Sequence, residues 1–156
     1  MAETDSPDAL LTVALQDLRD AADRLSAGLA AIGERITDPG LCHALGELTA
    51  QARHASAALV ATGRGAGGPD NIWMQGVLDD AARDAETVLA GPLLDQALAG
   101  AVRKGVAASV IAYETAIALA RAQRQDDLAG ELDQLRARDA AARDELGSII
   151  ARLAGV

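Results

Sequence analysis

Hydrophobic residues recur at alternating spacings of three and four along most of this chain. A stripe with this spacing is typical of a helix that buries one face in a bundle. The longest stripe runs through Leu11, Leu15, Leu18, Ala22, Leu25, Leu29, Ile32 and Ile36. Ser6 and Pro7 precede it, and a capping hydroxyl followed by proline predicts that a helix begins there.

The same pattern predicts four more helices. Their apolar stripes cover residues 41–59, 74–88, 94–120 and 128–153. Asp38 and Pro39 form the start signal of the second helix, and Pro92 forms that of the fourth. One polar residue, Asp139, lies within the apolar seam of the last helix.

Composition agrees with an all-α fold. Hydrophobic residues make up 50% of the chain but aromatic residues only 1%, with one Trp, one Tyr and no Phe. Alanine and leucine dominate, and both favour helices, whereas the residue types that favour strands are scarce. The sequence therefore predicts a four-helix bundle with an additional short helix in the crossover. We expect a single domain over residues 1–156, with a flexible N-terminus at 1–6 and a glycine-rich connector at 63–70.

Charge and the single cysteine limit the function and the location. The formal net charge of −9 would repel nucleic acid and anionic membrane surfaces, so we expect neither as a partner. No apolar run approaches the roughly 20 residues that a membrane span needs. Cys42 has no second cysteine to pair with, and acidic residues rather than an apolar leader occupy the first ten positions. We therefore expect a cytoplasmic protein.

Two blocks of the chain resemble a known family. Residues 15–25, continuing to Asp38-Pro39-Gly40-Leu41, form the first block. Residues 74–77, continuing through 93–98 to Arg103-Lys104, form the second, and Tyr113 follows at the position of a family tyrosine. With this spacing the chain resembles the YciE/YciF-type ferritin-like family of bacterial stress-associated proteins (domain of unknown function 892), as a divergent member, over about residues 10–153.

The resemblance implies a pair of iron or manganese ions bound inside the bundle by carboxylates and histidines. This sequence departs from that ligand pattern at four inward positions. Aliphatic or small side chains stand there: Ala22, Leu48, Val106 and Ser109. We therefore expect a degenerate metal site, with no cofactor and no catalytic residue.

Four other residues remain as weak metal candidates. Asp80 and Asp139 lie near acids of the family pattern, while Glu47 and His54 lie about two turns apart on the second helix. Gln51, three residues before His54, holds the acid position of a Glu-x-x-His motif, and a neutral amide is a poor ligand for these ions. A structural hydrogen bond is the alternative role for Asp139, with Tyr113, Ser109, Arg103 or Lys104 as expected partners.

The expected loss of the ligands would also reduce the side-chain volume inside the bundle. Replacement of four glutamates by small residues would remove on the order of 200 Å³ of side-chain volume. An empty void of that size would lower the stability of the fold by roughly 5 kcal/mol. Either the helices approach one another or an apolar molecule fills the space.

Three functions follow from these alternatives. The first is a non-enzymatic structural or protein-interaction module, stress-associated and homodimeric. The second is a bundle that binds an apolar small molecule. The third is a residual di-iron or di-manganese oxidoreductase or peroxide-scavenging protein, which requires that Glu47, His54, Asp80 and Asp139 converge.

Overall fold

The computed structural model describes residues 3–156, and this part of the chain forms five helices and no strand. The flexible N-terminus expected at 1–6 begins with two residues that lie outside the described ones. The helices are α1 (Pro7–Gly33), α2 (Pro39–Ala61), α3 (Ile72–Thr87), α4 (Pro92–Ala122) and α5 (Asp126–Ala154). The predicted all-α fold class is therefore confirmed.

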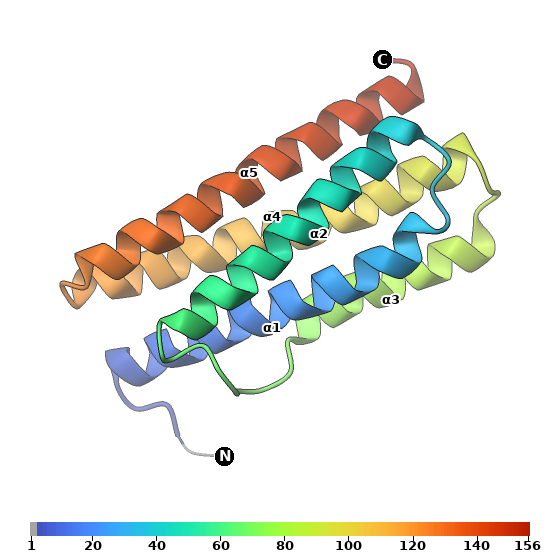
Figure 1. The fold of residues 1–156 in the computed structure, drawn as a ribbon. Helices are drawn as coiled ribbons and strands as arrows, with labels where there is room; N and C mark the ends of the chain where they lie inside the picture. The colour runs from blue at the N-terminus through green and yellow to red at the C-terminus, as the bar shows by residue number, and fades with distance from the viewer. Residues whose placement is uncertain (1–2) are drawn as a thin grey trace.

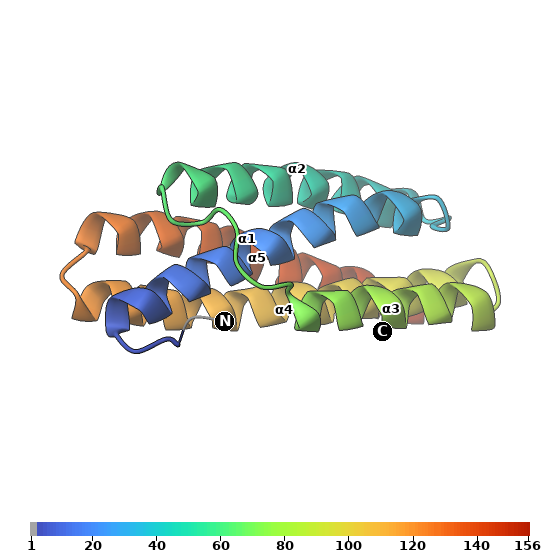
Figure 2. The same ribbon diagram turned by 90° about the horizontal axis from the view of Figure 1, so that it is seen from below.

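Four long helices run side by side along one axis, and the shorter α3 lies outside them (Figure 1). The helices α1 and α2 form one antiparallel hairpin, and α4 and α5 form another. Figure 2 shows α3 alongside α4 at the end where α4 begins. The crossover between the hairpins thus carries the additional helix, as predicted.

Local sequence signals explain where three of the helices begin. The side chain of Ser6 accepts a hydrogen bond from the amide of Ala9 at the start of α1. Asp38 caps α2 in the same way, and Asn71 caps α3. Each cap satisfies a backbone donor that the first helical turn leaves without a partner.

The apolar stripes fill the interior in two clusters, which meet near the middle of the bundle. One cluster surrounds Leu25, Leu45 and Leu98, and the other surrounds Leu15 and Tyr113. The predicted stripe of α1 needs two corrections. Ala21 rather than Ala22 is the fully buried alanine, and Ile36 is buried from the loop after α1 because the helix ends at Gly33.

The glycine-rich connector is not helical, as expected, but polar side chains of α1 hold it in place. The guanidinium of Arg19 donates to the carbonyl oxygens of Gly65 and Gly67 at 3.1 and 2.9 Å. Gln16 donates to the carbonyl of Ala66 at 3.1 Å. Gly65 is buried against the Leu59 carbonyl, where a Cβ atom would clash. The connector is therefore an ordered strap across α1.

One described helix, α4, is long and apolar enough to span a bilayer by length and composition, so the expectation that no apolar run approaches that length is wrong. Its most apolar window of 18 residues has a mean hydropathy of 1.3, and 44% of that window is buried inside the protein. More than half of this apolar stretch therefore lies at or near the surface.

Candidate functional site

The centre of the bundle holds a small cavity to which four helices contribute. Its volume is about 10 Å³, which is the space that one water molecule needs. Ala22 from α1, Leu48 from α2 and Ser109 from α4 line it, so three of the four expected lost-ligand positions meet at one place. The fourth, Val106, is fully buried about one turn before Ser109. The remaining lining residues are Leu18, Leu25, Ala52, Ala55, Tyr113 and Asp139.

The donor atoms around this cavity do not fit a pair of metal ions. Iron and manganese need several carboxylate or imidazole ligands, and Asp139 is the one such side chain that lines the cavity. Ser109 uses its hydroxyl to donate to the Gly105 carbonyl at 3.2 Å, as a helical serine commonly does. Over residues 3–156, no three His, Cys, Asp or Glu side chains lie together in a way that could hold a metal ion.

The hydrogen-bond partner of Asp139 is Gln51, which is not one of the four expected partners. The amide nitrogen of Gln51 donates to its Oδ1 at 2.6 Å, across the α2–α5 contact. Tyr113, Ser109, Arg103 and Lys104 were the expected partners, and that expectation is wrong because none of them bonds to Asp139 within the described residues. Gln51 lies three residues after Leu48 and one before Ala52, so it borders the buried stripe of α2, but this spacing does not show which side chain it meets.

Burial changes the ionisation of both titratable groups at the cavity. Removal of the Asp139 carboxylate from water raises its pKa from 3.8 to about 6, and the hydrogen bond from Gln51 only partly opposes this effect. Burial raises the pKa of Tyr113 further above its usual value of 10, and the nearby negative charge of Asp139 adds to the rise. The phenol therefore stays protonated, and Asp139 is the group that titrates.

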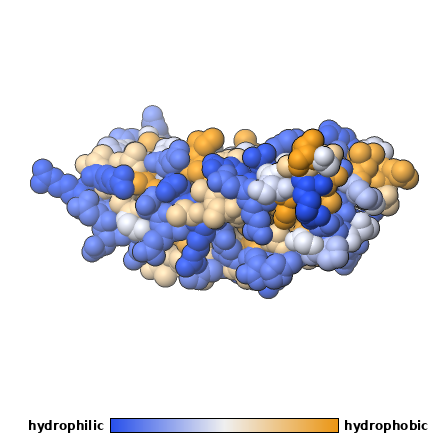
Figure 3. Space-filling model, turned by 90° about the horizontal axis from the view of Figure 1, so that it is seen from above, coloured by the Kyte–Doolittle hydropathy of each residue, from blue (hydrophilic) through white to orange (hydrophobic). Residues whose placement is uncertain are grey.

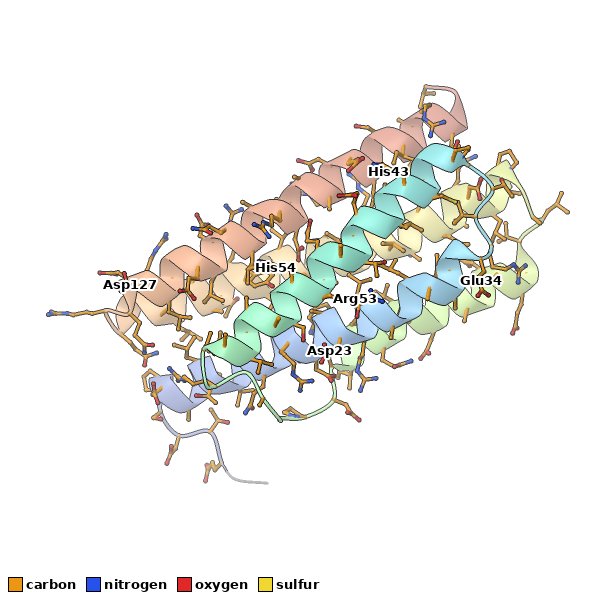
Figure 4. The ribbon with its side chains drawn as sticks, in the orientation of Figure 1. Asp23, Glu34, His43, Arg53, His54 and Asp127 are labelled. Atoms are coloured by element: carbon orange, nitrogen blue, oxygen red, sulfur yellow. The ribbon has the colours of Figure 1, made fainter. Side chains whose placement is uncertain are left out.

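The other metal candidates lie on the surface. Glu47 and His54 are both exposed on α2, and Figure 4 shows His54 well away from His43 along that helix. Asp80 on α3 forms ion pairs with Lys104 at 3.1 Å and with Arg83. The bond from Lys104 lowers the pKa of Asp80, with further lowering from Arg83. The structure thus brings these candidates to separate places rather than to Asp139.

A second buried carboxylate, Asp95, is not predicted by the apolar spacing of the sequence. It is 1% exposed at the start of α4 and accepts three hydrogen bonds from the loop between α1 and α2. The donors are the amide and hydroxyl of Thr37 and the amide of Asp38, at 2.7 to 2.9 Å. This carboxylate is fully satisfied, so it fixes the loop against α4.

Asp38 extends that connection to the end of α5. Its two carboxylate oxygens accept hydrogen bonds from Arg152 at 2.7 and 3.0 Å while one of them also caps α2. The bonds from Arg152 and from the Leu41 amide lower the pKa of Asp38 to about 2. Residues from α2, α4 and α5 are thereby tied together at one end of the bundle, and this arrangement is structural.

Comparison with known proteins bears on the fold. No family model matches the chain, and no curated protein does either. Among solved structures, the Escherichia coli stress protein YciF superimposes with a TM-score of 0.90, over 96% of this chain and 98% of that one, at 16% identity. This chain has the fold of YciF. The resemblance seen in the sequence is therefore confirmed for the fold.

A second structure shares the YciF fold. YcfI from Rhodopseudomonas palustris, described provisionally as a structural protein, superimposes with a TM-score of 0.83 at 21% identity. The match covers 93% of this chain and 95% of YcfI. Both structures match almost end to end, so the fold is shared over nearly the whole chain.

The interior of this bundle is closely packed. Removal of four larger side chains would leave on the order of 200 Å³ in rigid helices, whereas the central cavity measures about 10 Å³. Ala52 and Ala55 permit this because alanine lets neighbouring helices approach closely. The central cavity therefore has no room for an apolar molecule.

Proposed function

We propose that this protein is a metal-free helical bundle that acts as a structural or protein-interaction module. It is not an enzyme in this proposal, and it functions as a homodimer in the cytoplasm of a stressed cell. The observation that carries the proposal is the packed centre, where Ala22, Leu48 and Ser109 line a cavity of about 10 Å³ and Gln51 donates a hydrogen bond to Asp139.

The size of the central cavity supports a non-enzymatic role. Ligand and substrate sites are typically about 300 to 1,000 Å³, whereas this cavity holds about 10 Å³. A packed bundle can still present a surface to another protein. Seen from the α5 side, hydrophobic side chains form separate groups bordered by hydrophilic ones (Figure 3), a pattern that suits contact with protein better than insertion into lipid.

Elemental analysis tests this proposal directly. The protein is purified without chelators from cells grown with added iron and manganese, and its metal content is measured per chain. We expect far less than one ion per chain and a thermal midpoint that a chelator leaves unchanged, because a bound metal would stabilise the folded state. About two ions per chain, or a midpoint that falls on chelation, would overturn the proposal.

A surface groove favours a second candidate, the binding of an apolar small molecule. The groove between α1 and α3 has a volume of about 400 Å³, and Ile32, Ala81 and Leu98 form its buried floor. Its size lies within the range of ligand sites. Native mass spectrometry of the freshly purified protein tests this candidate, because a retained ligand adds a discrete mass. A spectrum with the bare chain mass alone counts against it.

A further inference from the structure

The hydroxyl of Tyr113 is buried at the centre of the bundle and has no hydrogen-bond partner among residues 3–156. Tyr113 is 2% exposed, and its side chain lines the central cavity. In the described part of the chain, every polar side-chain atom that is cut off from water-sized space has a partner, so this hydroxyl borders such space. Burial also keeps the phenol protonated. The hydroxyl therefore has a proton to donate and needs an acceptor at the cavity.

Asp139 offers an acceptor, but the phenol does not reach it directly. The Oδ1 atom of Asp139 accepts the hydrogen bond from Gln51 at 2.6 Å, whereas its Oδ2 atom accepts none from residues 3–156. The charge of Asp139 is near enough to raise the pKa of Tyr113, yet no hydrogen bond joins the two side chains. Two polar groups that border one space without touching are commonly bridged by water.

Ser109 supplies a third polar atom at the same cavity. Its hydroxyl donates to the Gly105 carbonyl at 3.2 Å, so its oxygen is left with lone pairs that can accept a hydrogen bond. Every other side chain that lines the cavity is apolar: Leu18, Ala22, Leu25, Leu48, Ala52 and Ala55. Three polar groups thus converge on one small space inside an apolar shell.

The volume and the polar groups together fit a single water molecule. The cavity measures about 10 Å³, close to the smallest space that holds one water, and a buried water typically makes about three hydrogen bonds. A water here can accept from the Tyr113 hydroxyl and use its two protons to donate to Asp139 Oδ2 and Ser109 Oγ. A metal ion would need several carboxylate or imidazole ligands, and this cavity is lined by one carboxylate.

We propose that the central cavity binds one internal water molecule, which accepts a hydrogen bond from Tyr113 and donates to Asp139 and Ser109. The water links α4 to α5 at the carboxylate through which Gln51 already links α2 to α5. Both oxygens of Asp139 are then hydrogen-bonded, and three helices are joined at one point. This inference rests on the proposed function of a metal-free bundle, since it names what occupies the centre.

A crystal structure of the full chain that resolves ordered solvent tests the site directly. We expect one peak in the cavity, at about 2.5 to 3.0 Å from Tyr113 Oη, Asp139 Oδ2 and Ser109 Oγ. An empty cavity would overturn the water site and leave the metal-free bundle untouched. A peak at about 2.0 to 2.2 Å from Asp139 would be a metal ion, and it would overturn both.

Thermal unfolding of Tyr113→Phe gives a change of opposite sign in the two cases. If the hydroxyl bonds to water, its removal loses a hydrogen bond, and we expect the thermal midpoint to fall by about 2 to 4 °C. If the hydroxyl were buried without a partner, its removal would relieve an unsatisfied polar group. A midpoint equal to or above that of the wild type would therefore overturn the proposal.

Two serine variants provide a matched comparison of the bound water. The hydroxyls of Ser109 and Ser148 each donate to the carbonyl four residues earlier at 3.2 Å, but Ser148 is exposed on α5. In crystals of Ser109→Ala we expect the water peak to weaken at least about two-fold, because one of its three partners is gone. In Ser148→Ala we expect the peak to persist at full height. An equal peak in both variants would show that Ser109 does not hold the water and would overturn the proposed site.

Discussion

At the scale of single residues, one polar interaction joins two helices at the centre of the bundle. Gln51 and Asp139 come from α2 and α5, and their hydrogen bond joins the two helices across the cavity. Burial raises the pKa of Asp139 to about 6, because the hydrogen bond from the neutral Gln51 amide only partly offsets the loss of water around the carboxylate. Asp139 is therefore a group whose charge costs stability near neutral pH.

Asp139→Asn should make the protein more stable at high pH and leave it unchanged at low pH. The pKa of Asp139 is about 6 in the folded protein and 3.8 in the ordinary carboxyl, so ionisation opposes folding as the pH rises from 4 through 6. We expect the free energy of unfolding of the variant to exceed that of the wild type by about 1 to 3 kcal/mol at pH 8. Urea unfolding at pH 4 and pH 8 measures the difference. An equal difference at both pH values would contradict this explanation.

At the scale of elements, apolar spacing defined the helices well because burial of one face repeats regularly. Five helices and the capping roles of Ser6 and Asp38 could be predicted in this way. The same reasoning could not identify Gln51, Asp95 or Arg19, since their roles depend on where distant segments meet. Apolar periodicity locates a buried face, but it does not show which polar side chain on the edge of that face finds a partner.

The strap across α1 is an element whose order depends on such polar contacts. Arg19→Ala removes the hydrogen bonds to Gly65 and Gly67, as well as the ion pair to Asp23 at 2.8 Å. We expect a loss of about 1 to 2 kcal/mol in unfolding free energy and faster proteolysis within residues 63–70. Hydrogen exchange and limited proteolysis measure the effect. Arg53→Ala on exposed α2 is the control, and equal cleavage of both variants would show that Arg19 does not hold the strap.

At the scale of the whole molecule, alanine sets how closely the helices approach. The sequence predicts small side chains at positions where the family that it resembles has metal ligands, but it leaves open whether the resulting space is empty, filled or closed. That question depends on the backbone positions of four helices at once, which no local pattern specifies. The cavity of about 10 Å³ shows that α1, α2, α4 and α5 pack closely around these small side chains. The scarcity of aromatic residues therefore reflects close helix packing.

Ala52→Leu distinguishes a closed interior from an open one. Ala52 is 5% exposed and lines the central cavity, so three additional carbon atoms have no space unless the helices separate. We expect a loss of about 1 to 3 kcal/mol in unfolding free energy, as is typical of overpacked cores. Ala57→Leu, at an exposed position of the same helix, should change stability by less than about 0.5 kcal/mol. If leucine at position 52 instead stabilised the protein, the interior would contain usable space, and a bound apolar molecule would become the better explanation of how the centre of this bundle is filled.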